Sequence, residues 1–564
     1  MEADEIAELG RLIDVASNCV GPCARAQALR TSDAPGAGMV LSSSAAAVLQ
    51  HWPMARGHHV VRLVVETTQG HLQRHCDGGW LFLNFCLRVT LVLLGLRRSG
   101  LTGQFVSLSR TAALHGLALA SAWMHEVLAD EACPCRHKLS WSDLPSVLAV
   151  LRGPLCKPVA LACSDDLRHL TVVILEAFLH VLPSSVDDDS KVESNLRYSW
   201  FGGLDISWSS VVHGLVLDTP AALAVDAPRH GGDSLLVLFH ASLEQWLPGD
   251  SDALGMESYA VDTEFTRVTM DPSVLRQWEL SQYQRLADAV VAAGIRVLAC
   301  QKLVDPWLCD HLQHRGVTVL SRLSLRHVDH VQRMTGAVPI ASLAALPERL
   351  GDVCGLVGRA ELRTVCQRTY TVLHHAGQGP AAANATAVAS SRAVARPCAT
   401  LLVAAPDEPG LAELRRCVPQ AVRCLQEAAI SGAALHGGGR FEAHLAEALG
   451  ERARRAGEAG GEADGSAAAC GAAGAVADCL LEVAACLPAD SKRRSALASS
   501  VSPSSGSFVA VRELAQRLKG CSGETSVVLD AQGPKVGALL GALDLAGILI
   551  RLGGVLDLVN HPIG

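Results

Sequence analysis

The sequence predicts a mixed α/β protein that is divided into several domains. With 564 residues, the chain is too long for one hydrophobic core. From Glu5 to about Leu148 the apolar residues recur mostly with helical spacing, whereas Arg296–Leu343 contains short β-branched runs separated by helical segments. These patterns predict a mainly helical part and a separate α/β part.

Arg296–Leu343 is predicted to form a compact α/β unit. Val297–Cys300, Val317–Leu320 and Val338–Ile340 have the length and the β-branched content of buried parallel strands. Pro339 restricts the third run to the edge of a sheet, because proline cannot donate a ladder hydrogen bond. A second helical segment lies between the second and third runs.

Sequence signals mark both ends of the helix between the first two strands. Asp305 can accept hydrogen bonds from the free N–H groups of the first turn, and Pro306 fits that turn because its missing N–H costs nothing there. Gly316 can supply the left-handed residue that ends the helix. We therefore predict a helix over Pro306–Arg315.

One face of this helix is a candidate binding surface. Trp307, His311 and His314 recur at three- and four-residue spacing and so share a face, whereas Leu308 and Leu312 are expected to point toward the sheet. Exposed aromatic side chains are frequent in protein-binding hot spots, which favours partner binding by Trp307, His311 and His314. The alternative, that Trp307 packs into the core, stays open.

Charge and cysteine content restrict the functional class. Lys and Arg total 48 against 56 Asp and Glu, with no long basic block, so nucleic acid is not an expected partner. The 19 cysteines are odd in number and scattered, and no signal peptide precedes them, which is typical of a reduced cytoplasmic compartment. Cys133–His137 has ligand-like spacing but no second pair, so no metal site is predicted.

Gly79–Leu96 is apolar enough to raise the question of a membrane helix. Arg88 falls in the middle of the segment, where insertion would cost about 2.5–3.5 kcal/mol, and Asn84 adds to that cost. A helix buried in a large protein core fits the sequence better. We therefore expect no membrane insertion.

Several short motifs along the chain form a recognisable set. The α/β unit contains Gln301-Lys302, Ser321-Arg322 and Thr335-Gly336-Ala337, and Leu435–Glu442 carries a triple glycine followed by an acid. In these motifs and their order the chain resembles the cytosolic (group II) chaperonins. The resemblance is strongest to the divergent chaperonin-like branch associated with the McKusick–Kaufman and Bardet–Biedl syndromes.

The resemblance implies a group II chaperonin subunit with a helical equatorial domain, a small intermediate domain and an α/β apical domain. The equatorial domain would comprise residues 1–148 and 435–564, the intermediate domain 149–194 and 357–434, and the apical domain 195–356. Residues 377–394 have the composition of a flexible linker. Arg452–Ala475 and Pro488–Ser507 are low-complexity insertions to which we assign no fold.

The resemblance also implies a remnant of a nucleotide site. Gly21-Pro22 stands where the family has Gly-Pro-x-Gly, and Ser44 replaces the acid of a second family motif. Where the family has Gly-Asp-Gly-Thr-Thr, Asp77 and Gly78 remain, but Gly79-Trp80 removes both hydroxyls and puts an indole where a phosphate should pass. The remnant site would comprise Gly21, Pro22, Asp77, Gly78, Gly79, Gly437, Gly438 and Gly439. An ordinary helix-capping role for Asp77 is an equally open alternative.

A fourth motif concerns the attacking water. The family run Glu-Arg-Ser-x-His-Asp-Ala falls on Arg415–Ala421, so Gln420 replaces the water-positioning acid and Pro419 is expected to disturb the helix unless it lies at a kink. No catalytic residue is therefore assigned, and the chain is not expected to be an enzyme. No cofactor is certain, and ATP with Mg²⁺ would bind weakly at best.

For function, the resemblance implies a chaperonin-like protein that assists assembly of the ciliary complex called the BBSome. Its partners would be other chaperonin-like Bardet–Biedl proteins, the cytosolic chaperonin ring and BBSome subunits, in the cytoplasm near the centrosome and basal body. The alternative is an ATP-dependent folding subunit of a ring. The residues at the nucleotide site distinguish the two.

Overall fold

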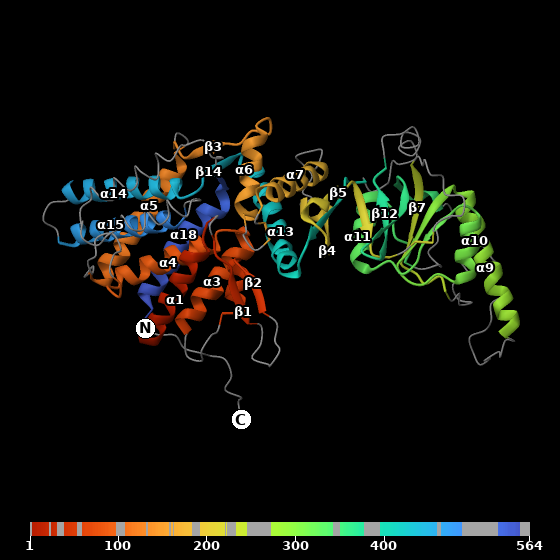
Figure 1. The fold of residues 1–564 in the computed structure, drawn as a ribbon, viewed down its shortest axis with the longest axis horizontal. Coiled ribbons are helices and arrows are strands. Elements are labelled where there is room, and N and C mark those ends of the chain that lie inside the picture. Colours follow the sequence, from red (N-terminus) through yellow and green to blue (C-terminus); the bar gives the residue numbers. More distant parts are fainter. Residues whose placement is uncertain are drawn as a thin grey trace, which may run out of the picture. The chain divides into compact units, whose positions relative to one another are not determined.

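The computed structural model (Figure 1) describes residues 3–21, 24–30, 39–52, 59–97, 108–130, 133–156, 160–161, 163–182, 192–219, 221–222, 233–244, 272–341, 350–376, 395–459, 464–487 and 528–552. Two compact units share these residues. Unit 1 comprises Met1–Val172, Gly202–Ser207 and Ala405–Gly564, and unit 2 comprises Val173–Phe201 and Trp208–Ala404. The linker predicted at 377–394 and the insertion predicted at Pro488–Ser507 lie outside the described residues.

Unit 1 is mainly helical, and its helices come from both ends of the chain (Figure 1). Two small antiparallel sheets accompany them: the hairpin β1–β2 and a three-stranded sheet in the order β15-β14-β3. The helices are α1 (Ala3–Cys19), α2 (Ala45–Gln50), α3 (His59–His75), α4 (Gly79–Leu93), α5 (Arg110–Ala129), α6 (Leu144–Leu155), α13 (Glu408–Ser431), α14 (Arg440–Ala459), α15 (Asp464–Cys486) and α18 (Gln532–Arg551). The strands are β1 (Gln27–Arg30), β2 (Met39–Ser42), β3 (Arg136–Lys138), β14 (Ala433–His436) and β15 (Leu529–Ala531).

Helix α4 forms the centre of the unit 1 core, which confirms the predicted buried helix. All fifteen of its residues are buried, and it contacts α1, α3, α15 and α18. Arg88 is kept inside this core by an ion pair with Glu482 of α15. Its guanidinium also donates to Asn84 Oδ1 at 2.6 Å and to Ser17 Oγ at 3.0 Å. The charge that argues against a membrane helix is therefore satisfied by protein partners.

Two other helices, α15 and α18, are long and apolar enough by composition to cross a membrane. In the structure 78% of the apolar window of α15 and 56% of that of α18 is buried against other helices. Helix α15 packs on α14, α5 and α4, and α18 packs on α4 and α5. Packing inside unit 1 accounts for their composition.

The segment Arg452–Ala475, to which the sequence analysis assigns no fold, is mostly helical. Residues 452–459 continue α14, and residues 464–475 begin α15, so most of the segment is helical. Its small residues allow close packing: a Cβ atom on Gly116 of α5 would lie 2.3 Å from the Cβ of Ala472 and 2.7 Å from the Ala469 carbonyl oxygen. The alanines and glycines of this segment fit a tight helix contact.

Unit 2 contains the predicted α/β unit. Its four-stranded sheet has the order β10-β7-β8-β9, with β7 (Ser234–Phe239), β8 (Ile295–Cys300) and β9 (Thr318–Leu320) parallel and β10 (Gly355–Val357) antiparallel to β7. Alternate residues of β7 and β8 face two separate apolar clusters. One cluster includes α9 (Pro272–Ala292) and α10 (Pro306–His314), and the other includes α11 (Leu325–Thr335).

The strand predicted at Val338–Ile340 is reduced to a single bridge between Ile340 and Phe239, beside β7. Two three-stranded sheets complete the described part of unit 2, in the orders β4-β13-β5 and β11-β12-β6. Their strands are β4 (Leu196–Gly202), β5 (Ser210–Val212), β6 (Gly214–Leu217), β11 (Ala360–Val365), β12 (Arg368–His374) and β13 (Ala399–Ala405). The short helix α8 (Val192–Asn195) precedes β4, and α7 (Ser164–Val181) includes the boundary between the two units.

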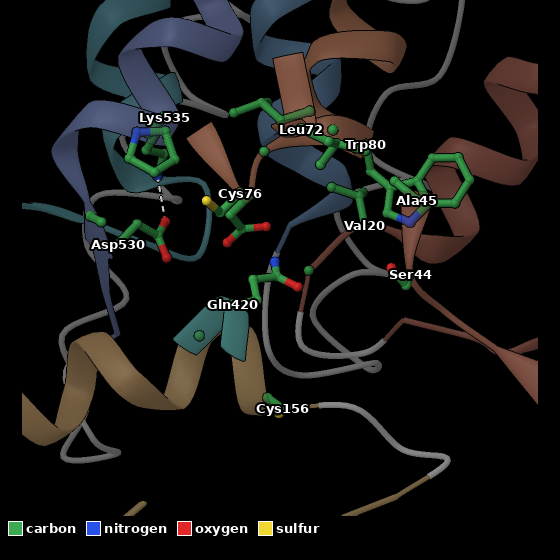
Figure 2. Close-up of a pocket in the computed structure, with 18 of the residues that line it drawn as sticks. Val20, Ser44, Ala45, Leu72, Cys76, Trp80, Cys156, Gln420, Asp530 and Lys535 are labelled. Carbon is green, nitrogen blue, oxygen red and sulfur yellow. Dashed lines mark hydrogen bonds and ion pairs between the residues drawn. The ribbon is translucent and has the colours of Figure 1, made fainter. Parts of the chain in front are cut away.

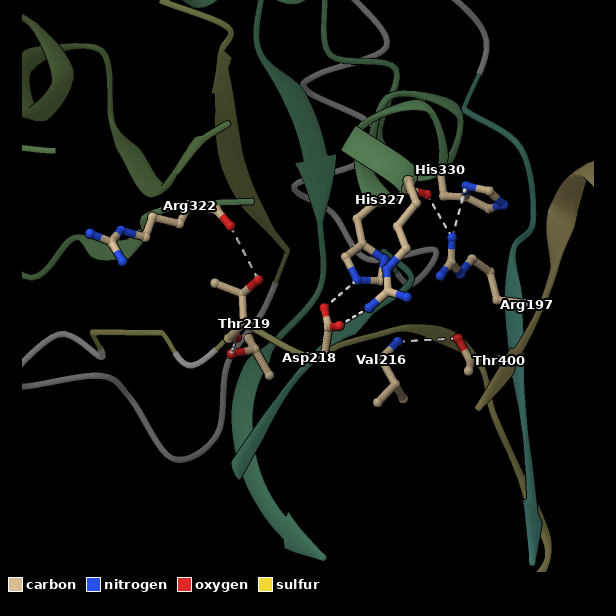
Figure 3. A network of polar contacts seen from close by, with 10 residues as sticks. Arg197, Val216, Asp218, Thr219, Arg322, His327, His330 and Thr400 are labelled. Carbon is tan, nitrogen blue, oxygen red and sulfur yellow. Dashed lines mark hydrogen bonds and ion pairs between the residues drawn. The ribbon is translucent and has the colours of Figure 1, made fainter. Parts of the chain in front are cut away.

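A polar network connects β4, the end of β6 and α11 inside unit 2 (Figure 3). Asp218, which follows β6, accepts from His327 Nε2 at 2.6 Å and pairs with Arg326 through its other oxygen. Arg197 of β4 donates to the Arg326 carbonyl oxygen at 2.6 Å and lies 3.5 Å from Nδ1 of His330. These contacts fix the first turns of α11 against the two strands.

Candidate functional site

A cavity of about 490 Å³ lies in unit 1 (Figure 2). Gly21, Ser44 and Gln420 line it, together with Asp77–Trp80 from the start of α4 and Gly438 from the turn before α14. Segments from five separate parts of the sequence therefore meet at one place, as the motif analysis requires. Its size is within the usual range for a small-molecule site. Pro22 lies outside the described residues.

The loop Cys76–Gly79 has an unusual backbone that leads directly into α4. Cys76 has φ +66° and Gly78 has φ +81°, both in the left-handed region that favours glycine. A Cβ on Gly78 would lie 3.0 Å from the Pro534 carbonyl oxygen. His71 Nε2 lies 2.9 Å from the Asp77 carbonyl oxygen and fixes the other side of the loop. Burial, reinforced by His75, lowers the pKa of His71 to about 4, so this ring is neutral at pH 7.

The indole of Trp80 lies in the wall of the cavity. It is only 6% exposed, and its Nε1 donates to the Ser43 carbonyl oxygen at 2.8 Å. Through this hydrogen bond Trp80 fixes the segment between β2 and α2. That the indole occupies the path of a phosphate stays a prediction. The cavity remains open beside it (Figure 2).

The segment with Ser44 is also attached to α13. Glu413, which is completely buried, accepts from Ser42 Oγ at 2.7 Å and from Ser43 Oγ at 2.9 Å. Arg416 lies 3.3 Å from the same carboxylate. This carboxylate is used for structure, while Ser44 itself lines the cavity with a hydroxyl where the family motif has an acid.

Gln420 lines the cavity from α13, which runs without interruption from Glu408 to Ser431. The expected disturbance at Pro419 does not end the helix; proline only removes one N–H donor from the helical ladder. An amide at position 420 can orient a water molecule, but it cannot accept a proton as a carboxylate does. Gln420 therefore lies at the cavity, where the family motif has a water-positioning acid, but it contributes an amide instead of a carboxylate.

The three glycines after β14 have different roles. Gly438, with φ +64°, is the one that lines the cavity. A Cβ on Gly439 would lie 2.4 Å from the Ala484 carbonyl oxygen, and one on Gly437 would lie 2.7 Å from Val528 Cγ1. Close packing therefore explains Gly437 and Gly439, and only Gly438 keeps the position of a ligand-binding residue.

A buried ion cluster borders the cavity and is missing from the sequence-based site. Lys535 Nζ lies 2.7 Å from Asp530 Oδ2, 2.9 Å from Glu442 Oε1 and 3.3 Å from the His436 carbonyl oxygen. Burial alone would lower the pKa of Lys535, but the carboxylates of Asp530 and Glu442 outweigh that effect and raise the pKa. The available signal was a lysine in the first turn of a mainly apolar helix.

Three arginines complete the cavity lining: Arg152 of α6 and Arg416 and Arg423 of α13. Arg423 donates to Cys76 Sγ at 3.3 Å and so joins α13 to the loop before α4. Together with the first turn of α4, these cations supply donors for an anion. Asp77 and Asp530 are acids that line the same cavity, whereas Ser44 and Gln420 contribute a hydroxyl and an amide. The cavity therefore has the composition of an anion-binding site.

The predicted binding face of α10 consists of Trp307, His311 and His314. The face they form is only partly exposed. Leu308 and Leu312 are fully buried, and Asp305 caps α10 by accepting from the Trp307 N–H at 2.9 Å. Trp307 and His311 are half-buried and their rings stack with centroids 4.7 Å apart. His314 is exposed. Trp307 also packs against the α9/α10 apolar cluster, so both alternatives for this residue hold in part.

Comparison with known proteins places these features in context. The model of the TCP-1/cpn60 chaperonin family matches residues 140–492. The human molecular chaperone MKKS is 23% identical over 435 residues, which cover 77% of this chain and 68% of that protein, and its mouse counterpart is 23% identical over 442 residues, covering 78% and 69%. Thermosome subunit alpha of Archaeoglobus fulgidus is 24% identical over 287 residues, covering 50% of this chain and 46% of the subunit.

Proposed function

The chain belongs to the TCP-1/cpn60 chaperonin family, and from that premise we propose that it binds partner proteins as a chaperonin-like molecule without efficient ATP hydrolysis. Its similarity to molecular chaperone MKKS supports a chaperone role. Following the same relationship, we propose that it assists assembly of the BBSome together with other chaperonin-like Bardet–Biedl proteins and the cytosolic chaperonin ring. The proposed location is the cytoplasm near the centrosome and basal body.

The observation that carries this proposal is the altered acid set around the unit 1 cavity. Phosphoryl transfer to water depends on positioning and charge neutralisation, which require a metal-holding acid and a group that orients water. Asp77 still lines the cavity, but Ser44 and Gln420 stand where the family motifs have carboxylates. Loss of one such group typically lowers the rate on the order of 10²- to 10⁴-fold, and two are replaced here.

We therefore expect no ATP turnover above background. Purified protein is incubated with Mg²⁺ and ATP, and phosphate release is compared with that of Asp77→Ala. Asp165→Ala is the matched control, because Asp165 is an exposed acid that does not line the cavity. Turnover well above background that Asp77→Ala abolishes and Asp165→Ala preserves would overturn the proposal and favour the ATP-dependent folding subunit instead.

Partner identity has its own test. The tagged chain is expressed in ciliated cells, and the proteins that copurify with it are identified by mass spectrometry. BBSome subunits and chaperonin-like Bardet–Biedl proteins should be enriched over a tag-only control. Enrichment of neither group would contradict the assembly role even if the ATPase result is as expected.

We also expect the Trp307/His311 face of α10 to take part in partner capture. Changing both residues to alanine removes a stacked aromatic pair at the surface and should reduce copurification about tenfold, since central aromatic residues dominate binding energy. Gln313→Ala on the same helix is the control, and thermal unfolding of each variant corrects for any loss of fold. Unchanged partner recovery in the Trp307/His311 variant would remove this face from the binding surface.

A further inference from the structure

Three arginines and a histidine form a group on the surface of unit 2 that has few acidic partners. On α11, Arg326, His330 and Arg333 lie four and three residues apart, so they share one face of the helix. Arg197 of β4 reaches the same face, because its Nη1 lies against both the Arg326 carbonyl oxygen and the His330 ring (Figure 3). We call these four residues the basic face of α11.

The contacts of Arg197 are the unusual part of this surface. Its guanidinium is half-buried, and its hydrogen bonds within the described residues go to a carbonyl oxygen and an imidazole, with no carboxylate among them. A buried or half-buried guanidinium normally has an anionic partner, because it loses hydration on burial. Burial and the neighbouring Arg326 lower the pKa of Arg197, as expected for a cation without a counter-ion.

Arg333 has a similar environment. It is exposed, and its Nη1 donates to the Ser194 carbonyl oxygen of α8 at 3.1 Å. Carboxylates near the basic face include Asp218, Asp329 and Glu193 of α8, which is the sequence neighbour of Ser194. Asp218 is already shared between Arg326 and His327, while Asp329 is an exposed residue of α11. Two guanidiniums, those of Arg197 and Arg333, are therefore left to face an incoming anion.

The two histidines of α11 on or beside the basic face have lowered pKa values, mainly because they are buried. The pKa of His330 is lowered to about 4 by burial, Arg197 and Arg333, and that of His327 is lowered to about 4 by burial, Arg197 and Arg326. Both rings are neutral at pH 7, so the positive charge of the face comes from the arginines. Arginine pairs with carboxylate and phosphate groups through two parallel hydrogen bonds, which gives geometry as well as charge.

We propose that the basic face of α11 is a second partner-binding surface, and that it binds an anionic segment of a partner protein through Arg197 and Arg333. This inference rests on the proposed function, since it assumes that the chain binds partner proteins. It specifies what the partner presents to this surface, which is a run of carboxylates or of phosphorylated side chains. The surface lies on different elements from the Trp307/His311 face of α10.

The test measures binding of a fluorescein-labelled peptide of twelve alternating Glu and Ser residues to the full chain by fluorescence anisotropy. A peptide with Gln in place of Glu is the uncharged comparison, and one with phosphoserine in place of Ser separates the two sources of negative charge. We expect binding of the acidic peptides at 50 mM NaCl that weakens at 200 mM, and no binding of the uncharged one.

The decisive variant is Arg197→Gln combined with Arg333→Gln, which should weaken peptide binding at least about tenfold. Arg363→Gln removes one charge from an exposed position on β11 and should change affinity less than about twofold. Equal losses in both variants, or no binding of either acidic peptide by the wild type, would overturn the inference. Copurified partners together with absent peptide binding would reject this surface alone, whereas peptide binding without partners would reject the proposed function alone.

Discussion

Replacing Lys535 by methionine is expected to lower the free energy of unfolding of unit 1 by about 3–5 kcal/mol. The substitution keeps most of the side-chain volume and removes the charge. Glu442 is fully buried and would lose its cation, and Asp530 would lose the partner 2.7 Å from its Oδ2. An uncompensated buried carboxylate is much more costly than the absence of the whole ion pair.

The difference in cost between one unpaired buried charge and no buried charge provides the control for this experiment. The double variant Lys535→Met/Glu442→Gln removes both charges from the buried pair and should recover most of the lost stability. Denaturant unfolding midpoints of the wild type, the single variant and the double variant give the comparison. A single variant that unfolds at the wild-type denaturant concentration would show that the cluster around Lys535 contributes no net stability.

The substitution Arg88→Met in α4 should have an effect of similar size, again about 3–5 kcal/mol. Arg88 is the cationic partner of Glu482, and the side chain of Glu482 is only 8% exposed. The hydrogen bonds from Arg88 to Asn84 and Ser17 would be lost as well. Thermal unfolding of the purified protein measures the loss, and Arg88→Met/Glu482→Met should recover part of it.

Arg88→Met also tests whether α4 is a core helix or a membrane helix, because the two cases predict opposite changes in stability. In a membrane helix, removing a central arginine would relieve about 2.5–3.5 kcal/mol of insertion cost and stabilise the helix. In the core of unit 1 the same change should destabilise the chain. Increased stability of Arg88→Met would therefore contradict the role assigned to α4.

Elements with a strong local pattern could be predicted from the sequence. The helix from Pro306 to His314 has its cap, its proline and its buried leucines in the expected places, and Gly316 has the expected left-handed conformation with φ +79°. Helix α4 was predicted as a core helix because its segment is strongly apolar while Arg88 and Asn84 in its middle argue against membrane insertion. In both cases the decisive information lies within about twenty consecutive residues.

Arg452–Ala475 shows where such local information ends. Alanine and glycine give little apolar periodicity, so the segment has the composition of a low-complexity insertion. Its structure depends on Gly116 of α5, where no side chain separates the two helices. Such a contact is decided by a residue more than 300 positions away, which periodicity in a single window cannot reveal.

The candidate site, too, could be predicted only where its residues belong to a local sequence motif. Family motifs identified Gly21, Asp77 and Gly438, and the structure places all three at one cavity. Arg152, Arg423 and Asp530 were missed because each lies outside the family motifs. The orientation of Trp80 could not be predicted either, since it depends on a hydrogen bond to the Ser43 carbonyl oxygen.

The division of the chain into two units has a consequence for its synthesis. Unit 2 is formed almost entirely by one stretch of sequence, whereas the core of unit 1 joins residues from both ends of the chain. Arg88 and Glu482 are 394 residues apart. At a translation rate of 5–20 residues per second, the ribosome needs about 20–80 s to make the second partner after the first. During that interval the apolar surface of α4 lacks α15 and α18, two of the helices that pack on it, so this relative of chaperonins is itself expected to need a chaperone as it emerges.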